Sequence, residues 1–444
     1  MTVTIGSEVT LDVEKPVAGG RMLARHEGRI VLVWGAIPGE RIRARIDRVG
    51  RGVLYAETSD VLASSVDRRD GGPDWRCGGN VFAHIAYERQ LHLKAEIIRE
   101  TLGRIGRVPL PAPPDVVASP ERGYRMRARL HARGGRLGFF REGTHHLCDA
   151  ASTGQLLPET VEWIAAAERI VAQERLAGLV GVEIAENVRA DERACHLELA
   201  AGTDAAPFVR LAEAGRLTGL SAGRADRAGV ERLMGVPSVS DLLHVREGNA
   251  SSALRLRRDA RAFFQGNRYV LEPLVRHVVG LVPPGPVVDL YAGVGLFGLS
   301  LAAAGDEDIT LVEGDPVSGA DLKENAEPFG PQVTVDRRSV EAFLRMANAP
   351  GATFIVDPPR TGLSKEALGG IVQRQPARIV YVSCDIATLA RDTRTLLDAG
   401  YELGGVTGID LFPNTALVET IVTFSRPPVS SGSDRRRHQR DRRA

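Results

Sequence analysis

Short apolar runs alternate with helical intervals throughout the last third of the chain. Strands are predicted from these runs at residues 287–291, 308–313, 332–335, 353–357 and 378–383. Strands that alternate with helices in this way are typical of a mainly parallel sheet covered on both faces. Two further β-rich runs, at 401–412 and 416–424, are expected to complete the sheet. The pattern predicts an α/β domain of the doubly wound type.

The first part of the chain has a different pattern, in which short β-rich runs are separated by glycine turns. The runs lie at residues 8–13, 29–34, 41–46 and 53–56. Several short strands at such close spacing predict a small barrel.

Between these parts the pattern is mixed. Helices are predicted at 87–102 and 158–176, and a hairpin is predicted from the runs 125–131 and 136–140. A further helix, at 266–283, leads into the α/β domain. The middle region is therefore expected to be α+β.

Composition sets the class of protein. The chain has 444 residues, of which 43% are apolar and 25% charged, and this predicts a globular protein of roughly three domains at about 150 residues each. Charged residues interrupt every apolar stretch, so no membrane span is expected. The segment Met1 to Glu8 lacks the basic start and apolar core of a secretory signal, and we expect a cytoplasmic protein.

Positive charge is clustered although the formal net charge is only +1. Arginine recurs at 41–51, at 122–141 and in residues 427–444, which are predicted to form a disordered basic tail. Local basic stripes favour contact with a phosphate backbone, although each could also be a solvated face.

The four cysteines are scattered, without any Cys-x-x-Cys pair. This spacing supports neither a disulfide framework nor a metal site. Cys148 and Cys195 are expected to be buried, unreactive thiols. Cys384 is different, because it lies in a Ser-Cys-Asp turn between a predicted strand and a helix at 388–397. The helix start is expected to lower the pKa of this thiol, and a thiolate is a nucleophile.

A glycine-rich turn follows the first strand of the α/β domain. In Asp289-Leu-Tyr-Ala-Gly-Val-Gly-Leu-Phe-Gly298 the glycines let a cofactor approach the backbone, and a helix predicted at 297–304 begins there. Glu313 ends the next strand and could accept hydrogen bonds from both hydroxyls of a ribose. Taken alone, this pattern would also fit a nicotinamide or flavin enzyme.

Two features separate these alternatives. The spacing Asp-x-x-x-Gly-x-Gly from Asp289 is typical of S-adenosylmethionine-dependent methyltransferases, and Asp357-Pro-Pro-Arg360 resembles a motif that nucleic-acid methyltransferases place against substrate. Each carboxylate alone could be a helix cap or a solvated strand end. Because the carboxyl ends of consecutive strands meet at one edge of such a sheet, we expect a single S-adenosylmethionine site there.

Five ordered motifs resemble those of the RNA uracil-5 methyltransferases, which make 5-methyluridine in transfer and ribosomal RNA. They are Phe263-Phe-Gln-Gly-Asn267, Asp289-Leu-Tyr-Ala-Gly-Val-Gly295, Asp357-Pro-Pro-Arg-Thr-Gly362, Val382-Ser-Cys-Asp385 and Phe412-Pro-Asn-Thr-Ala-Leu-Val-Glu419. Residues 1–62 resemble the TRAM domain, an OB-like RNA-binding barrel. The resemblance implies a central mixed α/β RNA-contact domain at 74–256 and a Rossmann-like class I methyltransferase domain at 257–426.

The same resemblance implies roles for single residues. Cys384 would be the nucleophile and Glu419 the base. The implied cofactor-binding positions are Gln265, Tyr291, Gly293, Gly295, Glu313 and Asp357. Carbon 5 of uracil is a poor nucleophile until a thiolate adds to carbon 6 of the extruded base. Carbon 5 would then take the methyl group, and Glu419 would remove its proton.

The chain departs from the family at several positions. Cys77 is retained, but Asn80 stands where a second cysteine of the family's four-cysteine iron–sulfur site would fall, so an iron–sulfur cluster is not expected. Leu417 and Leu296 replace a common histidine and asparagine, and Asp385-Ile386 replaces Asn-Pro. These changes leave the rate and the RNA target open.

Other functions remain open from the sequence. Methyl transfer to an exocyclic amine would not need Cys384, and a non-catalytic RNA-binding factor could have kept the scaffold. A dinucleotide-dependent oxidoreductase would leave the barrel and the Ser-Cys-Asp turn unexplained. Base identity is read by pocket shape and RNA folding, so the choice between rRNA and tRNA stays undecided, with the barrel leaning to rRNA. The sequence gives no oligomeric state.

Overall fold

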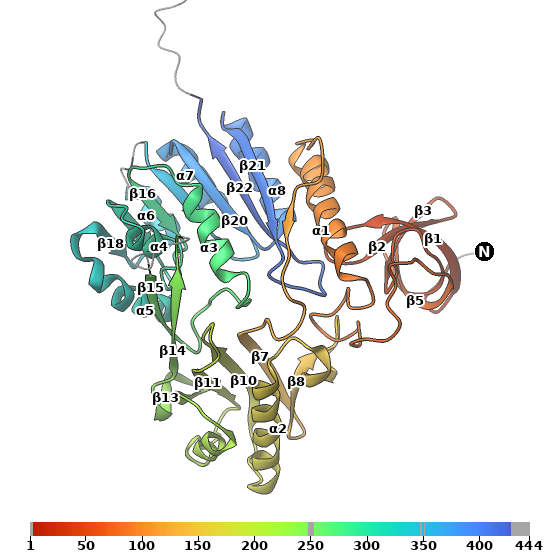
Figure 1. Cartoon of the computed structure of the whole chain (residues 1–444). Helices are drawn as coiled ribbons and strands as arrows, with labels where there is room; N and C mark the ends of the chain where they lie inside the picture. Colours follow the sequence, from red (N-terminus) through yellow and green to blue (C-terminus); the bar gives the residue numbers. More distant parts are fainter. Residues whose placement is uncertain (1–2, 247–252, 347–348, 350, 428–444) are drawn as a thin grey trace, which may run out of the picture.

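The computed structural model describes residues 3–246, 253–346, 349 and 351–427. Four sheet structures follow one another along the described residues: a barrel at the N-terminus, a central sheet, a two-stranded ribbon, and a large C-terminal sheet flanked by helices (Figure 1). The predicted basic tail at 427–444 lies, except for its first residue, outside the described residues. In the described part of the chain, no helix has the length and apolar character needed to span a membrane.

The N-terminal strands close into a barrel in the order β1-β2-β3-β5-β4. The strands are β1 (Glu8–Pro16), β2 (Met22–His26), β3 (Arg29–Trp34), β4 (Arg41–Val49) and β5 (Val53–Ala63). Exposed and buried residues alternate along β1 and β4, so apolar side chains fill the interior while the arginines of β4 face outward. The barrel prediction is confirmed, and β2 is an additional strand that the pattern did not indicate.

The central region contains a sheet in the order β13-β12-β11-β10-β7-β8-β9, counted over the described residues. Its elements are β7 (Arg127–Arg133), β8 (Arg136–Phe140), β9 (Leu147–Asp149), η2 (Ala151–Thr153), α2 (Pro158–Gln173), β10 (Leu179–Glu186), β11 (Arg193–Leu199), η3 (Ala206–Ala214), β12 (Gly219–Arg224) and β13 (Arg227–Gly235). Helix α2 buries Trp163 and Val171 against the sheet. The predicted hairpin is β7 with β8.

The C-terminal sheet has the order β18-β17-β16-β19-β20-β22-β21-β6 among the residues described, where the edge strand β6 is Val116–Val117. Its elements, with the β14–β15 ribbon before them, are β14 (Ser238–His244), β15 (Ala253–Asp259), α3 (Leu271–Gly280), β16 (Val287–Leu290), α4 (Gly298–Ala303), β17 (Ile309–Val312), α5 (Pro316–Ala326), η4 (Glu327–Gln332), β18 (Val333–Asp336), α6 (Val340–Met346), β19 (Thr353–Val356), α7 (Lys365–Arg374), β20 (Arg378–Ser383), α8 (Ile386–Asp398), β21 (Glu402–Ile409) and β22 (Glu419–Ser425). Strands β16 to β20 are parallel, whereas β22 is antiparallel to both of its neighbours. The predicted doubly wound domain is confirmed.

Helix α3 is shorter than the helix predicted at 266–283. The backbone before it is extended, because the Met126 amide donates to the Gly266 carbonyl and the Arg268 amide donates to the Tyr124 carbonyl. Pairing with the central region therefore replaces helical hydrogen bonds in the segment that carries Gln265.

A segment from the first quarter of the chain completes the C-terminal sheet. Helix α1 (Tyr87–Thr101) and the π-turn η1 (Leu102–Gly106) pack beside α8, and β6 (Val116–Val117) pairs with β21 as the edge strand (Figure 1). The boundary predicted at residue 74 assigns this segment to the central domain, and the boundaries remain predictions.

One expectation about the cysteines was wrong. Cys148 is not a free thiol: it forms a disulfide with Cys77, with 5.8 Å between their Cα atoms. The pairing was hidden in the sequence because 71 residues separate the two cysteines, and tertiary pairing of the Cys77 loop with Phe140 and Arg141 brings them together. Cys195 is buried and free.

Candidate active site

The glycine-rich loop between β16 and α4 has a left-handed backbone. Tyr291, Gly293 and Gly295 have φ angles of 62°, 58° and 103°. A Cβ at Gly295 would lie 2.4 Å from a Leu299 methyl group, whereas a Cβ at Gly293 would meet nothing within 4 Å. Gly295 is thus required by packing, and Gly293 leaves open space where a ligand can approach the backbone.

Asp289 lies inside β16 and is fully buried. Its Oδ2 atom accepts the Gly298 amide at 2.8 Å, and its Oδ1 atom has no partner among the described residues. Burial raises the pKa of Asp289 to about 8, with smaller contributions from the charges of Asp357 and Glu313. An unpartnered carboxyl oxygen beside the glycine loop fits a site built for a polar ligand.

Glu313 follows β17 and connects two backbone segments. Its Oε2 accepts the Gly293 amide at 2.7 Å and its Oε1 accepts the Asp315 amide at 2.6 Å. Each carboxylate oxygen keeps a free lone pair, so Glu313 can still accept both hydroxyls of a ribose. Burial raises the pKa of Glu313.

Asp357 follows β19 and contacts Gln265 from the extended segment before α3. The Gln265 Nε2 donates to Asp357 Oδ2 at 3.2 Å. Burial raises the pKa of Asp357 to about 7, although the bond from Gln265 opposes the shift. The loop after Asp357 is fixed to α8, because the Leu363 amide donates to Asp392 at 3.0 Å.

The pairing of β20 with β22 brings Cys384 and Glu419 together. The last antiparallel pair is Ser383 with Thr420, so one step further along each strand puts Cys384 opposite Glu419. Directly opposed side chains have Cβ atoms about 4.5–5.5 Å apart on one face. Cys384 is half-buried, whereas Glu419 is only 1% exposed and its Oε1 has no hydrogen-bond partner in the described part of the chain.

The electrostatics of Cys384 differ from the expectation. Burial raises the pKa of Cys384 to about 12, and the negative charges of Glu419 and Asp357 add to the shift. The start of α8 does not offset this effect, because Asp385 caps it: its Oδ1 accepts the amides of Ala387 and Thr388. The expected lowering of the thiol pKa by the helix start was therefore wrong.

Arg360 provides the opposing charge, and the sequence analysis gave it no role. The guanidinium charge and a hydrogen bond of Arg360 lower the pKa of Cys384. The same charge lowers the pKa of Glu419 and so opposes the effect of burial, which raises that pKa. The signal was present in the Asp-Pro-Pro-Arg motif, since an arginine directly after the site loop can face the residues at the adjacent strand ends.

The Asp289→Asn variant is expected to flatten the pH dependence of stability. The folded-state pKa of about 8 exceeds the unfolded value, so the folded state holds a proton that the unfolded chain loses, and wild-type stability falls as pH rises from about 4 to 8. Thermal and urea unfolding at pH 5 and pH 8 should show this variant gaining roughly 1–4 kcal/mol relative to wild type between the two pH values. Asp308→Asn, at an exposed carboxylate before β17, is the control, and an equal gain there would contradict the assignment.

The described residues contain no group of three or more His, Cys, Asp or Glu side chains arranged to hold a metal ion. All of the predicted site residues lie at the carboxyl ends of β16, β17, β19 and β20, at the start of β22, or in the segment before α3. The arrangement combines a nucleotide-type loop with a cysteine and buried carboxylates. With the C-terminal sheet order, it defines a class I, S-adenosylmethionine-dependent methyltransferase.

Comparisons with known proteins give the family. The TRAM domain pattern matches residues 2–58, and the tRNA (Uracil-5-)-methyltransferase pattern matches residues 340–427. The chain is 32% identical to the 23S rRNA (uracil(1939)-C(5))-methyltransferase RlmD of Halomonas elongata, over 92% of this chain and 87% of that protein. It is 30% identical to an uncharacterized RNA methyltransferase of Streptomyces avermitilis, over 96% and 100% of the two chains. The protein belongs to the RNA uracil-C5 methyltransferase family.

A solved structure supports the fold. The Pyrococcus abyssi tRNA (uracil-54, C5)-methyltransferase, in complex with S-adenosyl-L-homocysteine, superposes with a TM-score of 0.75 at 23% sequence identity. The match covers 93% of this chain and 99% of that one. The likeness thus extends over the barrel, the central region and the C-terminal sheet.

Proposed function

We propose that the protein methylates carbon 5 of a uridine in RNA, with Cys384 as the nucleophile and Glu419 as the base. The observation that carries the proposal is the register between β20 and β22. Ser383 pairs with Thr420, so the next position along each strand puts Cys384 opposite Glu419. A thiol opposite a carboxylate matches what the reaction needs on the two sides of one pyrimidine ring: a group that adds at carbon 6 and a base for the proton at carbon 5.

The proposed cycle begins at the sulfur of Cys384, which loses its proton to solvent and forms a bond to carbon 6 of the uracil. The electron pair of the double bond between carbons 5 and 6 moves toward the carbonyl at position 4, whose oxygen takes the negative charge. Bound S-adenosylmethionine supplies an electrophilic methyl group on a positively charged sulfur. Carbon 5 forms a bond to this methyl group, the bond between the methyl group and the donor sulfur breaks, and S-adenosylhomocysteine is left. Glu419 then accepts the proton from carbon 5. The bond between Cys384 and carbon 6 then breaks, and 5-methyluridine is released.

The residues of the glycine loop suit the methyl donor. We assign Tyr291, Gly293 and Gly295 to the loop that contacts the methyl donor and Glu313 to the ribose of the donor. Gln265 and Asp357 are assigned to the boundary between the donor and the uracil. The open space at Gly293 and the unpartnered Oδ1 of Asp289 support this assignment.

The barrel and the central region would bind the RNA. Outward arginines on β4 support a role in phosphate contact, in line with the TRAM pattern at residues 2–58. An rRNA substrate is favoured over tRNA, because the 32% identical relative of Halomonas elongata acts on 23S rRNA. A cytoplasmic location and the domain limits 1–62, 74–256 and 257–426 belong to the same proposal.

The decisive experiment is methyl transfer from labelled S-adenosylmethionine to RNA from cells that lack this gene, with the labelled nucleoside identified by mass. Label in 5-methyluridine is expected, and fragment mapping would identify the uridine. Label in another nucleoside would point to an exocyclic amine, and RNA binding without label would point to a non-catalytic factor.

Replacing Arg360 with leucine is expected to lower the reactivity of Cys384. The loss of the guanidinium raises the pKa of the thiol, so kcat at neutral pH should fall by about 10-fold or more and the pH–rate profile should move to higher pH. Alkylation of Cys384 by iodoacetamide in the free enzyme measures the same effect without turnover. Arg394→Leu, on α8, is the control, and unchanged alkylation in Arg360→Leu would contradict the role.

A further inference from the structure

The loop at 410–418 connects β21 to β22 and delivers Glu419. Ile409, the last residue of β21, pairs directly with Glu419, the first residue of β22. These two residues therefore form the base of the loop. The Glu419 Oε1 has no partner of its own in the described chain. No hydrogen bond from the described residues fixes this oxygen, so the position of the carboxylate depends on the backbone at Glu419, where the loop enters β22.

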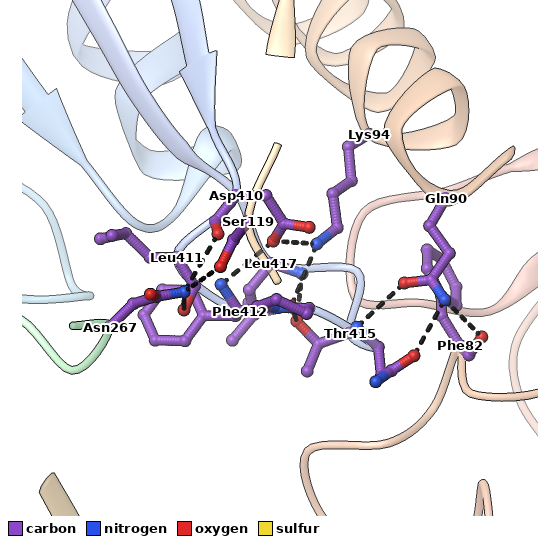
Figure 2. A network of polar contacts seen from close by, with 12 residues as sticks. Phe82, Gln90, Lys94, Ser119, Asn267, Asp410, Leu411, Phe412, Thr415 and Leu417 are labelled. Carbon is purple, nitrogen blue, oxygen red and sulfur yellow. Dashed lines mark hydrogen bonds and ion pairs between the residues drawn. The ribbon is translucent and has the colours of Figure 1, made fainter. Parts of the chain in front are cut away.

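Helix α1 holds the start of this loop by a fully buried ion pair. The Lys94 Nζ lies 2.5 Å from Asp410 Oδ1 and also donates to the Phe412 carbonyl at 3.0 Å, and both charged side chains are 0% exposed (Figure 2). The same Asp410 oxygen accepts the Phe412 amide at 3.1 Å. Tyr87 donates to the other carboxylate oxygen at 3.0 Å.

Asn267 holds the same loop from the opposite side. Its Nδ2 donates to the Leu411 carbonyl at 3.2 Å, to the Asp410 carbonyl at 3.4 Å and to the Ser119 hydroxyl at 2.8 Å. Asn267 lies two residues after Gln265, which contacts Asp357. The short segment from Gln265 to Asn267 thus contacts both the loop before Glu419 and the carboxylate of Asp357.

Gln90, one turn before Lys94 on α1, fixes the middle of the loop. Its Oε1 accepts the Asn414 amide at 2.9 Å, and its Nε2 donates to the Asn414 side-chain oxygen at 3.0 Å. The loop is therefore held at Asp410, Leu411, Phe412 and Asn414.

Stability alone does not explain this arrangement. A buried ion pair is often no more stabilising than apolar residues of the same volume, because desolvation offsets the attraction, whereas it does restrict geometry. Here the restricted element is the backbone that carries Glu419. Misplacing a catalytic group by about 1 Å can cost about 10²-fold in rate.

We propose that Lys94, Asp410 and Asn267 are positioning residues that place Glu419 for proton removal from carbon 5. The inference rests on the proposed function, since it takes Glu419 as the base. When the loop loosens, addition to carbon 6 and methyl transfer still occur, but elimination slows. A methylated covalent enzyme–RNA adduct then accumulates.

The test uses the full-length enzyme with the variants Lys94→Met/Asp410→Asn and Asn267→Ala. The double variant removes both charges together, so that neither is left buried alone, and Asn267→Ala keeps the ion pair intact. Lys15→Met is the matched control, because Lys15 pairs with Glu100 at the far end of α1 and does not contact the loop. Amide hydrogen exchange of residues 410–418 in the free enzyme, adduct amount, kcat, KM and the unfolding midpoint are measured for each.

We expect faster exchange in the loop, kcat lower by about 10–10²-fold with little change in KM, and adduct accumulation that Lys15→Met lacks. If kcat falls only with the folded fraction and no adduct appears, while Glu419→Gln does accumulate it, the positioning role is overturned and the proposed function stands. If Glu419→Gln also forms no adduct, the assignment of Glu419 as the base is overturned, and the positioning role with it.

Discussion

The Cys384→Ala enzyme is expected to lose methyl transfer to RNA by at least about 10⁴-fold, the scale on which enzymes lose activity with their covalent nucleophile. Without the sulfur, no bond forms at carbon 6, and carbon 5 stays too weak a nucleophile to take the methyl group. S-adenosylmethionine binding and the unfolding midpoint should stay close to wild type, because Cys384 is half-buried at a strand end outside the core. Single-turnover methyl transfer and calorimetric binding measure the two effects.

RNA that contains 5-fluorouridine gives a second readout of the same residue. A base can remove a hydrogen from carbon 5 as a proton but cannot remove a fluorine in this way, so the elimination that frees Cys384 is blocked. The wild-type enzyme should therefore stay bonded to this RNA through Cys384, and the alanine variant should not. Cys195→Ala is the control at the other free cysteine, and it should retain both activity and the adduct. Full activity in Cys384→Ala would refute the covalent route and favour transfer to an exocyclic amine.

The Glu419→Gln enzyme is expected to stop after methyl transfer. Loss of a general base typically costs about 10²–10⁴-fold, and here the cost falls on proton removal, so a methylated covalent adduct should survive denaturing gel electrophoresis. Burial raises the pKa of Glu419, and only its ionised form accepts a proton. The wild-type kcat should therefore rise as the pH increases through that raised pKa, and this rise should be absent from the variant.

Glu402→Gln is the matched control, because Glu402 is an exposed carboxylate at the opposite end of the same β21–β22 hairpin. It should turn over at the wild-type rate without adduct. Rapid turnover by Glu419→Gln would instead assign proton removal to another group, and Asp357, whose pKa burial raises to about 7, is the next candidate.

Periodicity predicted the elements of the fold well where local sequence decides them. The strand at 378–383 was predicted with the observed limits. The glycine loop was predicted from the spacing of its glycines, and in the structure a Cβ at Gly295 would clash with Leu299. Contacts between distant segments left no local signal. The ion pair of Lys94 with Asp410 joins residues 316 positions apart, and nothing in the pattern around 87–102 indicates that α1 belongs beside α8.

The candidate site was predicted as a set of residues but not as an electrostatic environment. The resemblance to the family's motifs selected Cys384 and Glu419, which lie directly after the end of β20 and at the start of β22. The pKa of Cys384 depends on burial and on three charges from two other segments, Asp357, Arg360 and Glu419, which only the folded chain brings together. Asp385 caps α8 by accepting the Ala387 amide, so the amides at the helix start are not free to stabilise the Cys384 thiolate as expected.

The completion of the C-terminal sheet by α1 and β6 constrains how the protein can be made. Lys94 leaves the ribosome 316 residues before its partner Asp410, which corresponds to roughly 15–60 s at the usual rates of about 5–20 residues per second. The N-terminal barrel, with its strands complete by Ala63, can close early in that interval. A nascent chain halted before residue 410 should therefore carry a protease-resistant barrel and an α1 that is still open to cleavage.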